Sequence, residues 1–203
     1  MKDSQQPELP ASFHARAEVL ADTLNGESDR GCAIIGAEIT SDRLESLLRA
    51  FFRSDSQSRK QIDPLFKGFG PVSTFSARIQ LAYVMYLIPR VIRDRLEMIR
   101  KIRNHFAHSP TPAKFTDAQC RDTLHILATG KFRVTETAEV VSNGGRKNRG
   151  AVFNGRFYFI CAVAQTATII ELLESLLLKH GDIREIVLHS EKTGAFEYDK
   201  DAS

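Results

Sequence analysis

The sequence predicts an all-α protein, a compact multi-helix bundle with a possible small β-hairpin excursion at about residues 131–153. Apolar residues recur at spacings of three and four along most of the chain, and glycine and proline signals divide it into helix-length pieces. The 203 residues are 42% hydrophobic and 26% charged, which is typical of a soluble globule. We expect one α-helical domain at 28–190, an arm with a short helix at 1–27, and a polar tail at 191–203.

The first long helix is expected to begin where Ser28 or Asp29 caps it. Within the preceding arm, residues 15–24 suit a short helix. The polar residues 54–60 predict a turn after the long helix. The apolar stripe of that helix recurs at helical spacing through Ala33, Ala37, Thr40, Leu44, Leu47, Leu48 and Phe51.

Two further helices are predicted between residues 68 and 110. The segment 68–71 reads Gly-Phe-Gly-Pro, so Ser73 or Thr74 should cap a new helix after it. Pro89 suits the first turn of the next helix, which Ser109-Pro110 should end because a residue before proline avoids the α region. Their apolar stripes comprise Phe75, Ile79, Ala82, Tyr83 and Tyr86, and then Ile92, Leu96, Ile99 and Phe106.

The C-terminal half predicts a short helix at 116–128, the possible hairpin, and a long apolar helix at 157–180. The long helix is of membrane-spanning length, but Gln165, Glu171 and Glu174 interrupt it, which favours a central core helix. Gly181 should supply its left-handed cap, and a last short helix is expected at 182–189.

The net charge of +3, from 28 Lys and Arg against 25 Asp and Glu, is too small to indicate nucleic-acid binding by itself. Its distribution is uneven. Residues 88–103 hold six basic and two acidic residues, whereas 182–203 hold three basic and six acidic residues. The turn at 142–150 carries Arg146, Lys147 and Arg149 without an acid, so these side chains are candidates for nucleic-acid or anion contact. A merely solvated loop is the alternative.

Several chemical classes find no motif in the sequence. There is no P-loop, GxGxxG, GxSxG or HExxH pattern, so we expect no cofactor and no common hydrolase mechanism. The three cysteines lie far apart, which favours reduced, buried thiols. His105 and His108 lack further ligands at a metal-site spacing, and we expect no metal. The first residues hold no apolar run, so we expect a cytoplasmic protein without a membrane segment.

The segment at residues 99–108 is the most informative candidate site. At 100° per residue, Arg103 falls between Ile99 and Phe106 on the apolar face, where a guanidinium needs a partner or an anion. A structural ion pair with Glu38 or Glu45 is one interpretation. Alternatively, Arg103 and Asn104 join His108 at a phosphodiester, with the imidazole moving a proton. Positions 103 and 108 lie about 140° apart in a straight helix, so they converge only if the helix frays or bends before Ser109-Pro110 or if a second subunit completes the site.

The chain resembles the mannitol operon repressor (MltR/MtlR-like) family. The resemblance covers residues 29–108, with a weaker echo at 156–173. This sequence departs from the family pattern at Met85-Tyr86, where a Leu-Gly pair is expected, and in the long insertion at 131–150. The carrying blocks are Ser28–Gly31 (SDRG), Ala33–Ala37 (AIIGA), Asp42–Phe52 (DRLESLLRAFF), Leu65–Pro71 (LFKGFGP), Ser73–Ile79 (STFSARI) and Leu96–His108 (LEMIRKIRNHFAH).

The resemblance implies a cytoplasmic, all-α bacterial transcriptional regulator that self-associates, without a standard DNA-reading motif and without enzymatic activity. Repression would then need a homo-oligomer or a partner regulator protein, and direct contact with DNA or RNA is left open. The pattern Arg103-Asn-x-x-x-His108 also resembles the motif of the HEPN superfamily, whose helical dimeric domains include ribonucleases. That resemblance implies the alternative, a metal-independent ribonuclease using Arg103, Asn104 and His108.

Overall fold

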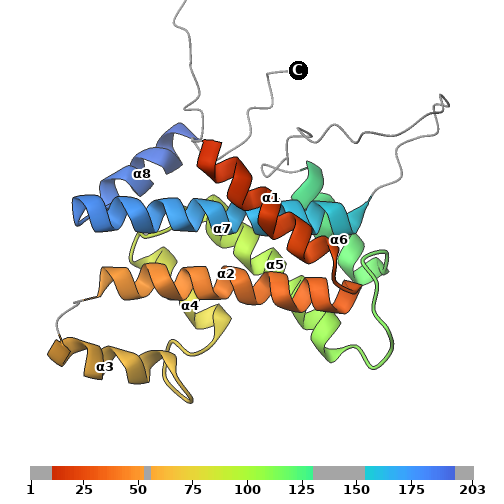
Figure 1. Cartoon of the computed structure of the whole chain (residues 1–203), viewed down its shortest axis with the longest axis horizontal. Coiled ribbons are helices and arrows are strands. Elements are labelled where there is room, and N and C mark those ends of the chain that lie inside the picture. Colours follow the sequence, from red (N-terminus) through yellow and green to blue (C-terminus); the bar gives the residue numbers. More distant parts are fainter. Residues whose placement is uncertain (1–10, 53–55, 130–153, 195–203) are drawn as a thin grey trace, which may run out of the picture.

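The computed structural model describes residues 11–52, 56–129 and 154–194, and within these ranges it holds eight α-helices and no strand (Figure 1). The all-α prediction is confirmed. The hairpin predicted at 131–153 lies outside the described residues. The helices are α1 (Ala11–Asn25), α2 (Asp29–Phe51), α3 (Ser56–Phe66), α4 (Phe75–Val84), α5 (Arg90–His108), α6 (Ala118–Thr129), α7 (Gly155–His180) and α8 (Arg184–Thr193).

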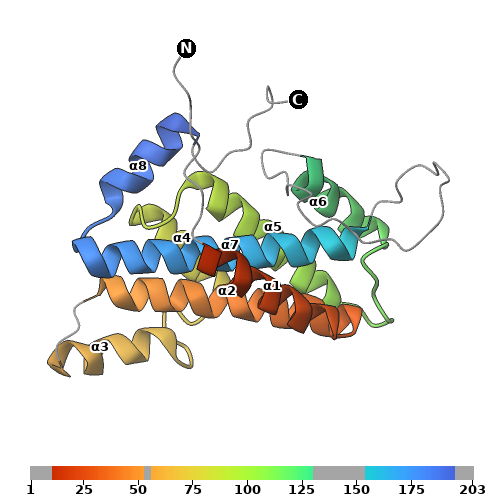
Figure 2. The same ribbon diagram turned by 45° about the horizontal axis from the view of Figure 1, so that its top comes forward.

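The two long helices α2 and α7 lie side by side and form the centre of the bundle (Figures 1 and 2). Gly36 permits their close approach, because a Cβ at this position would lie 3.0 Å from a ring carbon of Phe159 and 3.2 Å from Val163. Helix α7 is long and apolar enough to cross a membrane, yet 56% of its most apolar window is buried inside the bundle. This burial fits the predicted core helix.

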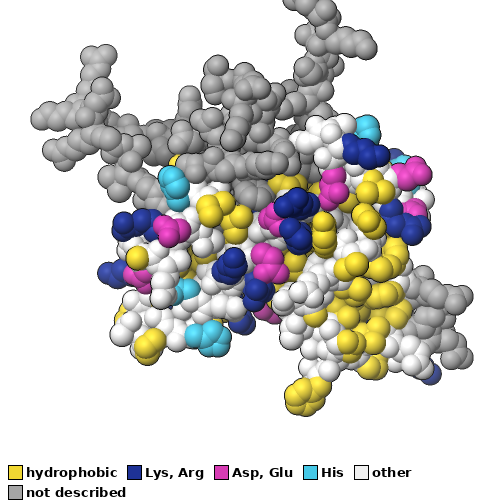
Figure 3. Space-filling view, turned by 180° about the vertical axis from the view of Figure 1, so that it is seen from behind, with side chains coloured by type: hydrophobic (Ala, Val, Ile, Leu, Met, Phe, Trp, Pro, Cys, Tyr) yellow, Lys and Arg dark blue, Asp and Glu magenta, His cyan; other side chains and the backbone are white. Residues whose placement is uncertain are grey.

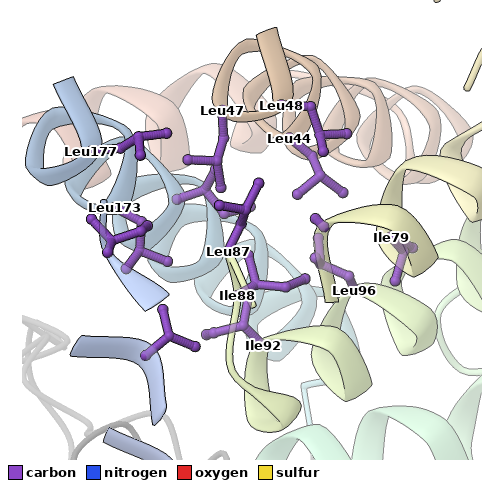
Figure 4. Packing of buried hydrophobic residues seen from close by; sticks show 14 of the residues in the cluster. Leu44, Leu47, Leu48, Ile79, Leu87, Ile88, Ile92, Leu96, Leu173 and Leu177 are labelled. Atoms are coloured by element: carbon purple, nitrogen blue, oxygen red, sulfur yellow. The ribbon is translucent and has the colours of Figure 1, made fainter. Parts of the chain in front are cut away.

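The core consists of two apolar clusters, and α5 contributes to both. In the first, leucines of α2 and α7 point toward Leu87, Ile88 and Ile92 (Figure 4). The second lies at the end of the bundle where α6 packs against α5 and α7. Its largest side chains include Phe106 of α5, Phe115 and Phe159, whose rings follow one another at centroid distances of 4.7 and 5.2 Å.

The helix ends confirm most of the predicted caps. Ser28 Oγ accepts a hydrogen bond from the Gly31 amide at 3.0 Å, and Thr74 Oγ1 accepts one from the Ala77 amide at 3.2 Å. Gly181 caps α7 with φ +76°. Pro89 lies one position earlier than predicted, as the N-cap of α5. Each of these signals acts within a single turn, which is why local sequence is enough to predict it.

The turn predicted at 54–60 is wrong from Ser56 onward, where α3 begins. This segment is polar, but its serine, glutamine, arginine and lysine residues tolerate a helix well. The helix is held from its other end, because Phe66 is buried in the first core cluster and Ile62 and Leu65 pack against it. A tertiary contact beyond the polar segment therefore decides its conformation.

The corner between α4 and α5 places Tyr86 in the left-handed region, with φ +56°. The Tyr86 amide donates to the Tyr83 carbonyl at 3.0 Å, and the Leu87 amide donates to the Ala82 carbonyl at 2.9 Å. This pair of hydrogen bonds is the Schellman motif, whose left-handed residue is usually glycine. Tyr86 is also the position at which the sequence departs from the family's expected Leu-Gly pair.

Candidate functional site on helix α5

Helix α5 buries one stripe of side chains and presents a row of charges on its opposite side. The spacing of the buried residues follows the helical period, so the stripe faces the core along the whole helix. The charged residues between them project outward. The buried stripe comprises Val91, Ile92, Arg95, Leu96, Ile99, Ile102 and Phe106.

Arg103 lies at the edge of this stripe and is half-buried, rather than within the apolar face as predicted. Its Nη1 donates to Oδ1 of Asn104 at 3.2 Å. The ion pair considered with Glu45 does not form, because the Glu45 carboxylate binds Arg49 and Arg78 instead. The other proposed partner, Glu38, is exposed. The prediction placed Arg103 too deep, because Val91, Arg95 and Ile102 are also buried and shift the centre of the stripe away from Arg103.

The buried guanidinium of α5 belongs to Arg95, which is 5% exposed. Burial lowers its pKa to about 10, and its Nη1 lies 3.5 Å from Oε1 of Gln165 on α7. The sequence analysis missed this residue, although Arg95 stands three residues after Ile92 and four before Ile99, on the same face. Arg95 and Arg103 stand four residues on either side of Ile99, so helical spacing alone does not choose between them.

A second buried arginine, Arg78 of α4, joins α4 to α2. Its Nη1 donates to Ser41 Oγ at 2.8 Å, its Nε donates to the Val72 carbonyl at 3.2 Å, and its guanidinium pairs with Glu45. Because these contacts satisfy the charge internally, Arg78 has a structural role and is not a ligand-binding candidate.

At the carboxyl end of α5, the imidazole with an ordered partner is that of His105, not His108. Its Nε2 lies 3.2 Å from Oδ2 of Asp117, and its side chain is 17% exposed. The same carboxylate oxygen accepts the Lys114 amide at 2.9 Å. The Lys114 amide, followed by His105, lowers the pKa of Asp117 below its ordinary value. This pair fastens α5 to the start of α6, and sequence reasoning did not connect the two residues.

The three residues proposed for phosphodiester chemistry are therefore only partly assembled. Arg103 and Asn104 are in contact, whereas His108 is exposed at the last position of α5, and the described contacts do not join it to either residue. Within the described part of the chain, no group of three potential ligands could hold a metal ion. Candidates Arg146, Lys147 and Arg149 lie outside the described residues.

The thiols have the character predicted from the cysteine spacing. Cys32 and Cys120 are buried, and Cys161 is half-buried. Burial raises the pKa of each thiol to about 11. A thiol that stays protonated at neutral pH is a poor nucleophile, so these cysteines belong to the core rather than to a reactive centre.

An open groove of about 480 Å³ runs between α4 and α5. On its α5 side, the guanidinium of Arg93 lies 4.6 Å from the ring centroid of Tyr83, which orients both side chains along the groove. Figure 3 shows the charged side chains of this face gathered beside a broad apolar area. The groove is lined by Ile79, Gln80, Tyr83 and Val84 of α4 and by Arg93, Asp94, Glu97 and Lys101 of α5.

The fold and this surface define a class, an all-helical protein whose helix α5 packs one face on the core and presents a row of mixed charge on the other. Residues 16–144 match the family model described as Mannitol repressor, which is more than half of the chain. The chain belongs to the mannitol repressor family.

Curated relatives agree with this assignment. The chain is 28% identical over 93 residues to the Mannitol operon repressor of Escherichia coli strain K12 and, to the same extent, to that of strain CFT073 of serotype O6:H1. The match covers 45% of this chain and 48% of each relative, so the chain spans about half the length of the curated relatives it matches. The fold is similar to a chain in the X-ray structure of the MtlR-HPr complex from Escherichia coli, with a TM-score of 0.50 and 21% identity over 81% of this chain and 99% of that chain.

Proposed function

We propose that this chain is a cytoplasmic transcriptional regulator of the mannitol operon repressor type. The family match over residues 16–144 carries the proposal, because it spans five of the eight described helices from α2 to α6 together with most of α1. The extended match outweighs the short Arg103-Asn104-His108 motif, which the described contacts assemble only in part.

The regulator acts as an oligomer or through a partner protein. A similar fold was solved in a complex of MtlR with HPr, which supports a protein partner for this chain as well. The outward row of α5 pairs most of its cations with Asp94 and Glu97, which leaves few free charges for a continuous phosphate backbone. If the chain binds DNA directly, Arg146, Lys147 and Arg149 are the residues expected to contact the phosphates. The affinity for DNA should then fall steeply as salt rises and when these residues are replaced.

A promoter reporter tests the regulatory function. The mannitol-operon promoter is fused to a reporter in Escherichia coli lacking its own mannitol operon repressor, and this chain is expressed from a plasmid. Reporter output should fall on mannitol medium, with the Escherichia coli repressor as the positive control. Output that stays unchanged while the control lowers it contradicts the proposal.

The ribonuclease alternative has its own assay. Varied RNAs are incubated with the chain in the presence of a chelator, alongside the His108→Ala variant. We expect no cleavage by either protein. Chelator-resistant cleavage that disappears in His108→Ala would establish the enzyme, because the imidazole is the proposed proton carrier.

A further inference from the structure

Tyr86 keeps a bulky side chain at a backbone position where glycine would stabilise the fold. A non-glycine residue in the left-handed region costs roughly 1 kcal/mol relative to glycine, since its Cβ crowds the following carbonyl. The tyrosine side chain does not offset this cost by deep burial, because it remains 48% exposed. Strain retained at an exposed aromatic residue points to a role outside the fold.

The neighbours of Tyr86 form a surface with apolar and cationic parts. Val84, the last residue of α4, is 66% exposed and lines the groove between α4 and α5. Along the outer side of α5, four cations stand against two carboxylates, and the Glu191 carboxylate of α8 accepts the Arg90 amide at 2.6 Å, so the surface keeps an excess of one positive charge. The cations are Arg90, Arg93, Arg100 and Lys101, and the carboxylates are Asp94 and Glu97.

The ion pairs of this row determine which charges remain available. Asp94 is engaged by Arg90 at 3.7 Å and also by Arg93, and Glu97 is engaged by Arg100 at 2.8 Å. Lys101 is exposed and forms no ion pair within the described part of the chain. Both carboxylates are thus already neutralised, and a ligand approaching the groove meets surplus positive charge beside apolar Val84 and Tyr86.

We propose that this α4–α5 surface, defined by Tyr83, Val84, Tyr86, Arg93 and Lys101, binds an acidic amphipathic helix of a partner protein. Apolar side chains of that helix would contact Val84 and Tyr86, and its carboxylates would lie along α5. The exposed apolar residues Val84 and Tyr86 favour a protein helix over nucleic acid, which offers phosphates at regular spacing and no apolar side chains. The inference rests on the proposed function, since it assigns a surface to the protein partner of the regulator.

The probe is a fluorescein-labelled peptide of about 18 residues, five helical turns, with leucines on one face and glutamates beside them. A matched peptide carries lysine at each glutamate position. Binding to the full chain is followed by fluorescence anisotropy at low and moderate salt. We expect the glutamate peptide to bind more weakly as salt rises, and the lysine peptide not to bind.

Tyr86→Gly separates a binding role from a structural one. Its melting temperature should rise by about 2–4 °C through relief of strain, whereas its affinity for the glutamate peptide should fall about fivefold or more. Tyr86→Phe should retain the affinity because the ring remains. Lys101→Glu should weaken binding, and the matched changes Leu178→Ser and Lys179→Glu, at exposed positions near the end of α7, should not.

Four results would overturn the inference. These are no binding of the glutamate peptide, equal binding of both peptides, preferential binding of a duplex DNA with the same dependence on Tyr86 and Lys101, or a fall in molecular mass from dimer to monomer in Tyr86→Gly. The last result would assign the surface to a second copy of this chain. If the chain does not lower reporter output but still binds the glutamate peptide, the proposed function is rejected and the proposed binding surface is retained.

Discussion

The two ends of α5 are built in opposite ways. At its carboxyl end, His105 binds Asp117, Arg30 Nη2 donates to the Ser109 carbonyl at 2.7 Å, and the ring of Phe106 is fully buried. At its amino end, the α4–α5 corner holds Tyr86 in a strained conformation beside an open groove. Both ends pack into the core, through Phe106 at one and through Ile88 and Ile92 at the other, but the α4–α5 corner also keeps a strained residue whose side chain is half exposed. This contrast is the reason for proposing the strained corner as the binding surface.

The largest expected effect comes from removing the buried aromatic ring at the carboxyl end of α5. Phe106→Ala removes a fully buried ring that packs against Phe115 at 4.7 Å, and it should lower the free energy of unfolding by about 3–5 kcal/mol. Urea denaturation measures this change. Val84→Ala at the other end is the matched comparison and should change stability by less than about 0.5 kcal/mol, because the side chain is mostly exposed. Similar losses of unfolding free energy in Phe106→Ala and Val84→Ala would contradict the proposed difference between the two ends of α5.

Replacing the strained residue should have the opposite sign. Tyr86→Gly is expected to raise the free energy of unfolding by up to about 1 kcal/mol, since glycine adopts the left-handed conformation without crowding. Thermal unfolding of Tyr86→Gly and Tyr86→Phe checks the prediction, because only the glycine variant relieves the backbone. Destabilisation by Tyr86→Gly would mean that the ring supports the corner.

The smallest expected effect concerns the pH dependence of stability that Asp117 gives to the carboxyl end of α5. The pKa of Asp117 is lower in the folded chain than in the unfolded chain, so its stabilising contribution is complete above the unfolded pKa of about 4 and is lost as pH falls through the folded pKa. Asp117→Asn should therefore lose less stability than the wild type between pH 5 and pH 3, with both proteins followed by urea denaturation. Parallel losses in the two proteins would show that the contacts of Asp117 with the Lys114 amide and His105 do not contribute to the pH dependence.

The helix ends were largely predictable from the sequence, because interactions within one helical turn determine them. Ser28, Thr74 and Gly181 act within one helical turn, and proline after Ser109 ends α5 where predicted. The beginning of α3 was not predictable in this way, because the contacts that hold it come from residues 62–66 packing on a distant core.

The candidate site was predictable to a smaller extent for the same physical reason. Choosing between Arg95 and Arg103 as the buried cation required the exact rotation of α5 against α7. The contact between His105 and Asp117 crosses a turn whose path the sequence does not specify. The departure at Tyr86 was visible in the sequence, but only its φ of +56° turns that departure into a statement about strain.

The central claim is that Tyr86 serves a partner at the expense of stability. Its most direct test measures promoter repression by Tyr86→Gly in the reporter strain, together with the melting temperature of the same purified variant and its level in the cell. The account predicts a higher melting temperature, an unchanged protein level and reduced repression. A Tyr86→Gly variant that is more stable and represses as well as the wild type would contradict it.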